Sequence, residues 1–160
     1  MIKSFIFENF KSFEKTELNI ESLTTLIGTN ASGKSNAIEG ITILAKAATG
    51  IDLSTILDGT KSTGTVVRGG SRGCARFKTN SFKLGCLIDF DETKDLLYEI
   101  KIAVGDRVGI EEEGLYLVKR DSLGPKSNKV FKTKKEEISV KANNVVLLTK
   151  SLQILPEKYH

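Results

Sequence analysis

The stretch Gly28-Thr29-Asn30-Ala31-Ser32-Gly33-Lys34-Ser35 decides how this chain folds. It matches the pattern G-x-x-x-x-G-K-[ST] at every fixed position. The glycines let the backbone curl so that successive N–H groups point at phosphate oxygens. Lys34 would supply a mobile charge to the β- and γ-phosphates, and the Ser35 hydroxyl would ligate Mg²⁺. The motif therefore predicts a nucleotide site, with Lys34 as the catalytic residue and Ser35 as the metal ligand.

The segments on both sides of this loop predict a strand and a helix. The segment 23–27 is short and mostly apolar, which predicts a strand buried within a sheet. After the loop, apolar residues recur at helical spacing and predict one face of a helix over 34–48: Ala37, Ile38, Ile41, Leu44, Ala45 and Ala48. Gly50 is typical of a helix stop. Such a helix would point its positive N-terminus at the phosphates.

The rest of the chain predicts mainly strands. Residues 2–7 and 17–20 predict a hairpin, and the Gly-, Ser- and Thr-rich residues 51–81 predict a long irregular connection. Five further strands are predicted at 82–90, 96–104, 109–119, 129–133 and 137–146. We therefore expect a single α/β unit over 1–160, in which a mixed sheet surrounds one long helix and 82–146 forms an antiparallel, β-rich extension.

Composition excludes several other classes of protein. The chain has 160 residues, 39% hydrophobic and 28% charged, which is ordinary for one globular domain. No apolar run reaches the ~18 residues of a membrane span, and the start lacks a secretory signal. Cys74 and Cys86 are too few for a disulfide framework, and the single histidine, His160, speaks against His-based catalysis and zinc. A reduced, cytoplasmic protein with no membrane partner is expected.

Charge is distributed unevenly along the chain. The formal net charge is +4, but residues 1–60 hold 5 Lys/Arg against 7 Asp/Glu, so the excess of positive charge lies in 61–160. A basic second part could help a polyanion approach. A solvated face is the preferred explanation, since Lys132-Thr133-Lys134-Lys135 is followed at once by Glu136-Glu137.

Four weaker signals carry little chemistry. Asp121-Ser122-Leu123-Gly124 and Asn128-Lys129 resemble GTPase motifs, but Phe131 stands where guanine recognition needs an acid. The apolar run that ends at Asp89 resembles a magnesium-supporting strand, yet Phe90 follows where a catalytic carboxylate is expected, so Asp89 and Asp91 are interpreted as the polar edge of a hairpin. Gln153 is a weak candidate for a magnesium-sensing glutamine.

Two segments together resemble a known family. Ile6-Phe7-Glu8-Asn9-Phe10-Lys11-Ser12-Phe13, followed by the loop and Asn36, resembles the amino-terminal signature of the RecF/SMC/OLD-like branch of ABC ATPases. Val66-Val67-Arg68-Gly69-Gly70 is similar to the segment after the first helix in these proteins. The branch includes ATPases of DNA repair, chromosome organisation and anti-phage defence.

The resemblance implies a P-loop NTPase of the ABC type and adds roles to individual residues. It implies that Lys11 and Ser12 lie beside ATP, that Asn30 approaches the γ-phosphate, and that Arg68 reaches toward nucleotide or DNA. Together with the motif, it implies that nucleotide contacts come from Lys11, Ser12, Gly28, Thr29, Asn30, Ala31, Ser32, Gly33, Lys34, Ser35, Asn36 and Arg68. ATP and Mg²⁺ are the expected cofactors. Expected partners of the full protein are a second protomer across the nucleotide, DNA, and a nuclease or toxin effector.

The same resemblance implies an incomplete catalytic site. Such ATPases complete their domain with a C-terminal half that carries the signature motif, the Walker B Asp-Glu and a switch histidine, none of which follows Ser35. The chain is therefore expected to be an N-terminal lobe that hydrolyses ATP negligibly by itself. The alternative is a non-catalytic nucleotide-sensing module that recruits a partner. A small-molecule kinase is disfavoured because 82–146 is β-rich.

Overall fold

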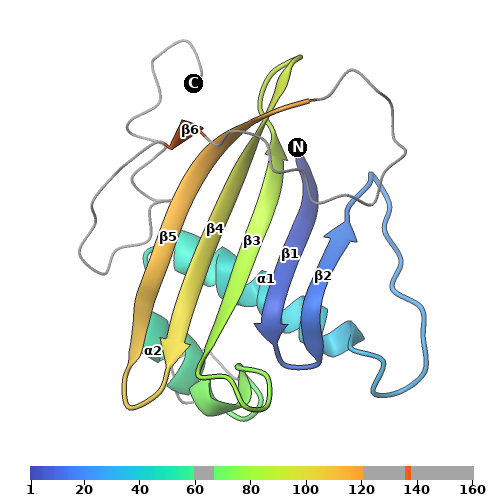
Figure 1. Cartoon of the computed structure of the whole chain (residues 1–160). Coiled ribbons are helices and arrows are strands. Elements are labelled where there is room, and N and C mark those ends of the chain that lie inside the picture. The colour runs from blue at the N-terminus through green and yellow to red at the C-terminus, as the bar shows by residue number, and fades with distance from the viewer. Residues whose placement is uncertain (60–66, 121–135, 138–160) are drawn as a thin grey trace.

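The computed structural model describes residues 1–59, 67–120 and 136–137. A sheet in the order β2-β1-β3-β4-β5-β6 forms the body of the molecule, and every pairing is antiparallel. Figure 1 shows its long strands side by side. Their bounds are β1 Ile2–Phe10, β2 Phe13–Asn19, β3 Ser81–Asp89, β4 Lys94–Val104, β5 Val108–Lys119 and β6 Glu136–Glu137.

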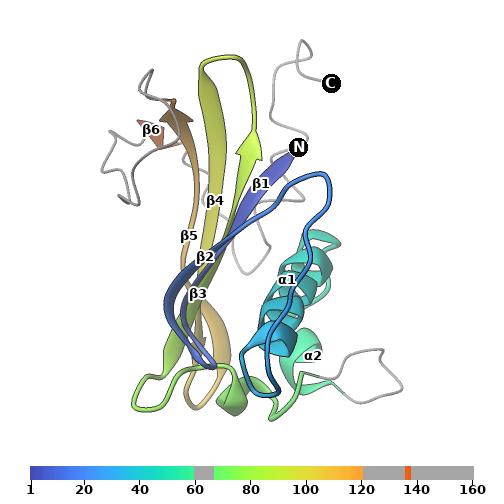
Figure 2. The same ribbon diagram turned by 90° about the vertical axis from the view of Figure 1, so that its right-hand side faces the viewer.

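The helices lie on one face of this sheet, as Figure 2 shows. Helix α1 spans Lys34–Ala48 and the short helix α2 spans Leu53–Asp58. A 3₁₀ turn, η2, follows at Ser71–Gly73. Gly50 adopts a positive φ of 81° and donates its N–H to the Ala47 carbonyl, so it ends α1 as predicted.

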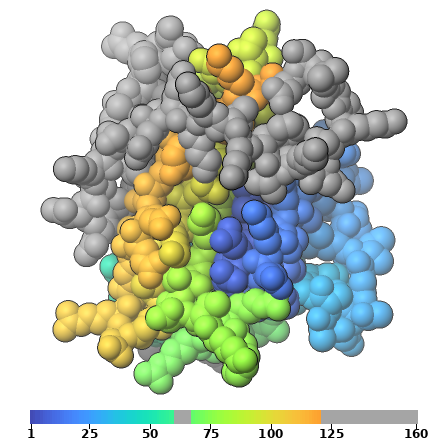
Figure 3. All heavy atoms as spheres, in the orientation of Figure 1, coloured from blue at the N-terminus to red at the C-terminus, as the bar shows by residue number. Residues whose placement is uncertain are grey.

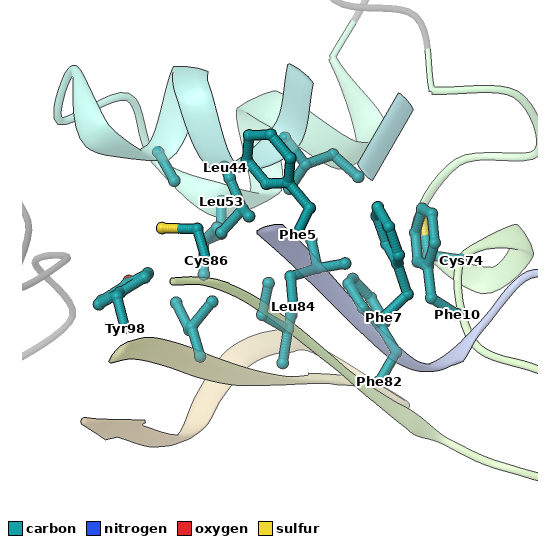
Figure 4. Close-up of a cluster of buried hydrophobic side chains, with 14 of the residues drawn as sticks. Phe5, Phe7, Phe10, Leu44, Leu53, Cys74, Phe82, Leu84, Cys86 and Tyr98 are labelled. Atoms are coloured by element: carbon teal, nitrogen blue, oxygen red, sulfur yellow. The ribbon is translucent and has the colours of Figure 1, made fainter. Parts of the chain in front are cut away.

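The core lies between the sheet and α1 (Figure 4). Phe7, Phe10 and Phe82 are almost fully buried, and the ring centroids of Phe10 and Phe82 are 5.2 Å apart. Tyr98 is also fully buried and donates its hydroxyl to Glu113 Oε1 at 2.6 Å. Burial and this carboxylate raise the pKa of Tyr98, so the phenol stays neutral.

Figure 3 shows the opposite face of the sheet, where side chains of β1, β3, β4 and β5 reach the surface. Lys101 Nζ lies 2.8 Å from Glu111 Oε2 and 3.7 Å from Glu112 Oε1, across the β4–β5 pair. The sheet therefore has one apolar face, which α1 and α2 cover, and one charged face, as expected of antiparallel sheets.

Most of the predicted elements are confirmed. The first hairpin, the helix and the strands near 82–90, 96–104 and 109–119 are all present. The predicted strand 129–133 and most of 137–146 lie outside the described residues. The connection over 51–81 is less irregular than predicted, because it contains α2, and the Asp52 carboxylate caps that helix by accepting from the N–H groups of Ser54 and Thr55.

Two predictions around the loop are wrong. Residues 23–27 form no strand, and Leu23 and Ile27 are 85% and 90% exposed. The predicted apolar face of α1 is also shifted, since Ala37, Gly40, Ile43, Leu44 and Ala47 are buried whereas Ile38 is 57% exposed. The helix carries apolar residues on two faces, and the sheet covers only one of these faces. The predicted mixed sheet is likewise antiparallel throughout the described strands.

Candidate functional site: the phosphate loop and its surroundings

The loop ends in a glycine that no other residue could replace easily. Gly33 precedes α1 with φ of 96°, in the left-handed region, and makes no side-chain cap. A Cβ at this position would lie 3.0 Å from the Phe13 ring and 3.2 Å from Ser12 Oγ. The loop therefore packs directly against the turn between β1 and β2, so residues 10–13 and 28–35 form one surface.

Lys34 is turned back onto its own loop. Its ammonium group donates to the carbonyls of Gly28 at 2.6 Å and Thr29 at 2.7 Å, and to Ser32 Oγ at 3.2 Å. These three acceptors hold the positive charge at the centre of the loop, where phosphate oxygens would be its competing partners. The side chains of Asn30 and Ser35 are exposed beside it.

The turn between β1 and β2 contributes two of the predicted residues. Lys11 adopts a positive φ of 50°, and its backbone N–H donates to the Cys74 carbonyl. Ser12 Oγ accepts a hydrogen bond from Asn36 Nδ2 at 2.9 Å. The turn is therefore fixed on one side to the loop around Cys74 and on the other to the first turn of α1.

Arg68 reaches the same place from the segment that follows α2. Its Nε lies 2.5 Å from Glu39 Oε1, and its Nη2 donates to Asn36 Oδ1 at 3.3 Å. Lys11 donates to the other carboxylate oxygen of Glu39 and, at 2.9 Å, to the Arg68 carbonyl. We call these five residues, Lys11, Ser12, Asn36, Glu39 and Arg68, the Glu39 network.

Glu39 is the site residue that sequence reasoning missed. Its side chain is 17% exposed and bridges two cations. Burial alone would raise the pKa of Glu39, but the hydrogen bonds and charges of Lys11 and Arg68 outweigh burial and lower it. The available signal was its position four residues after Ser35, which puts both on one side of α1.

The residues present fit a magnesium–nucleotide complex. The first N–H groups of any α-helix have no partner within the helix, and at α1 they open toward the loop. Two cations are available beside the loop, on Lys34 and Arg68. The exposed Ser35 hydroxyl is a neutral oxygen ligand. No group of three or more His, Cys, Asp or Glu side chains that could hold a metal occurs among the described residues. Mg²⁺ would therefore be held by Ser35 and by phosphate oxygens.

The remaining sequence candidates lie away from this surface or outside the described ranges. The register pairs Ile2 with Ile88, which puts Asp89 at the opposite end of β1 from the Lys11–Ser12 turn. Asp89 pairs with Arg120, and Asp91 Oδ1 accepts from the N–H groups of Thr93 and Lys94. Their interpretation as a hairpin edge is confirmed. Asp121–Gly124, Asn128–Lys129 and Gln153 lie outside the described residues.

A phosphate loop at the N-terminus of a helix that packs on an antiparallel sheet defines an ATPase lobe of the P-loop type. The chain belongs to the AAA ATPase domain family, which matches residues 1–158. The expectation of an ATPase domain is thereby confirmed.

Other comparisons cover smaller parts of other proteins. The solved structure of the recombination mediator protein RecF with ATP, from the RecFOR pathway, aligns with a TM-score of 0.45 and 20% identity, over 76% of this chain and 29% of that one. The lysine–tRNA ligases of Bacillus cytotoxicus and Bacillus anthracis are 47% identical over 75 residues, which is 44% of this chain and 15% of each enzyme. A match to 15% of an enzyme leaves most of that enzyme without a counterpart, so we assign no ligase activity here. Within the described residues, no helix is long and apolar enough to cross a membrane.

Proposed function

We propose that this chain binds Mg²⁺–ATP through residues 28–36 and serves as the nucleotide-binding lobe of an ABC-type ATPase. One observation carries the proposal: the complete phosphate-loop motif lies at the N-terminus of α1, with the Lys34 ammonium group at the centre of the loop. The ATP phosphates would replace the Gly28 and Thr29 carbonyls as partners of Lys34. Lys11, Ser12 and Arg68 would border the nucleotide on one side.

The experiment is calorimetric titration of Mg²⁺–ATP into the parent protein and into Lys34→Ala. Loss of this charge-assisted contact, worth roughly 1.5–3 kcal/mol, should weaken binding about 10- to 150-fold. Lys119→Ala is the matched control, because it removes an exposed lysine at the far end of β5. Equal affinities of the parent and Lys34→Ala would rule out this site.

We propose further that the lobe works within a larger ATPase. Leu23 and Ile27 lead into the loop, Ile38 lies on the outer face of α1, and all three are exposed. Exposed apolar side chains suit a surface that a second part of the ATPase domain covers. Such a completed domain, dimerised across the nucleotide, would supply the groups that orient the attacking water.

The biological setting is proposed from the sequence resemblance. The pairing of Asn9-Phe10-Lys11-Ser12-Phe13 with the phosphate loop favours an ATPase of DNA metabolism or anti-phage defence, with DNA and a nuclease or toxin effector as partners. The alternative is a nucleotide-sensing module without turnover. Phosphate release by the full-length gene product separates the two: DNA-stimulated hydrolysis favours the ATPase, and ATP binding without turnover favours the sensor.

A further inference from the structure

The Glu39 network is a closed ring of contacts built from three separate parts of the chain. Asn36 joins Ser12 to Arg68, and Glu39 joins Arg68 to Lys11, which neighbours Ser12 in sequence. The ring therefore connects the β1–β2 turn, the first two turns of α1 and the segment at Arg68. Its only acid is Glu39, so both cations depend on one carboxylate.

The two cations differ in what they can still bind. The Lys11 side chain is 8% exposed, and its ammonium group is already held by Glu39 and by the Arg68 carbonyl. The Arg68 side chain is 62% exposed. Of the five N–H donors of a guanidinium, Arg68 uses Nε toward Glu39 and one on Nη2 toward Asn36. The other three have no partner among the described residues.

These free donors lie beside the phosphate loop. Asn36, which Arg68 contacts, directly follows the proposed magnesium ligand Ser35 in the first turn of α1. A guanidinium with unused N–H groups binds phosphate oxygens well, because its fork can form two parallel hydrogen bonds. Without the Glu39 carboxylate, nothing else in the network would fix the direction of the Arg68 side chain, because the Asn36 contact is long and neutral.

We propose that Glu39 is the positioning residue of the nucleotide site: it holds Arg68 against the start of α1 so that the free guanidinium edge meets the phosphates of ATP. The inference rests on the proposed function, since it needs ATP at the loop. Glu39 touches neither ATP nor Mg²⁺ and acts through Arg68. Its bond to Lys11 fixes the carboxylate from the other side.

The test is a double-mutant cycle on Mg²⁺–ATP affinity. Arg68→Ala should weaken binding about 10-fold, the low end for a charge-assisted hydrogen bond, and Glu39→Gln somewhat less. Because Glu39 acts only through Arg68, adding Glu39→Gln to Arg68→Ala should change the affinity by less than about 2-fold. Glu39→Gln and Lys34→Ala, in contrast, should combine additively. Glu39→Asp keeps the charge and should lie between the parent and Glu39→Gln.

Controls separate positioning from folding. Glu14→Gln breaks an exposed ion pair, with Arg76 at 3.3 Å, and should leave affinity unchanged. If Glu39→Gln unfolds because Lys11 loses its partner, the whole cycle is run in a Lys11→Met background, so that any contact of Lys11 with the nucleotide cancels between its arms.

The outcomes distinguish this inference from the proposed function. Parent-level affinity of Glu39→Gln, or additive effects of Glu39→Gln and Arg68→Ala, would overturn the inference while leaving ATP binding intact. The inference would also be overturned if Arg68→Ala and Glu39→Gln weakened only the binding of single-stranded DNA. The guanidinium would then be assigned to nucleic-acid phosphates. A parent protein that binds no ATP would overturn both proposals.

Discussion

At the scale of single residues, the chemistry around the loop follows from a few charges in close contact. Lys34 is held by neutral loop oxygens, whereas Lys11 and Arg68 share the carboxylate of Glu39. Sequence patterns predicted the three cations, from the motif and from the family resemblance. The acid that organises two of them was not predicted, because a lone glutamate in a helix is ordinarily a solvated side chain. Only the fold brings Lys11 and Arg68 to it.

The lowered pKa of Glu39 makes part of the stability depend on pH. Because its folded-state pKa lies below the unfolded value of about 4.5, the carboxylate stabilises the fold above that pH, and this contribution is lost as the pH falls through the folded pKa. Glu39→Gln should therefore cost the most stability above about pH 4.5 and progressively less as the pH falls below it. Urea unfolding midpoints of both proteins over this range measure the difference, and a constant difference would contradict the ion pairs.

At the scale of elements, α1 explains both a success and a failure of sequence reasoning. Its bounds were predictable, because the loop fixes its start and Gly50 its end. Its buried face was not, since Ile38 and Ile43 are equally apolar in the sequence, and only contact with β1 and β3 decides between the two faces. The prediction of a strand at 23–27 was wrong for the same reason. A strand pattern shows that a segment suits a sheet but identifies no partner strand.

Gly40 lies where α1 packs tightly against aromatic rings of β1. A Cβ there would lie 2.6 Å from Phe7 Cε1 and 3.1 Å from Phe10 Cε1, both in buried rings. Glycine to alanine inside a helix ordinarily stabilises by about 1 kcal/mol, but overpacking costs about 1–3 kcal/mol. We expect Gly40→Ala to lower the free energy of unfolding by about 1 kcal/mol.

Chemical denaturation measures this change. Ala45→Gly, on the exposed side of the same helix, is the matched control and should lose about 1 kcal/mol by propensity alone. A rise in stability for Gly40→Ala would mean that α1 sits farther from β1 than described.

At the scale of the whole molecule, the antiparallel sheet serves as a platform with the proposed nucleotide surface at one end. The β1–β2 turn and the start of α1 meet at that end, and the Asp89–Arg120 cluster lies at the other. The strands of this platform were predictable from alternation and turn residues. Their order was not, because β3 pairs with β1 across the seventy residues 11–80, and no local pattern encodes that contact.

The central claim, that residues 28–36 bind Mg²⁺–ATP, is tested most directly by nuclear magnetic resonance on the ¹⁵N-labelled protein. At 17.5 kDa the chain suits backbone assignment. On titration with Mg²⁺–ATP, the amide signals of 28–36 should shift and saturate together, because their N–H groups are the proposed phosphate ligands. The turn at 90–93, between β3 and β4, should stay unchanged, because it lies at the opposite end of the sheet. Amide signals of 28–36 that do not move at millimolar Mg²⁺–ATP, or a saturating response confined to other residues, would contradict the account.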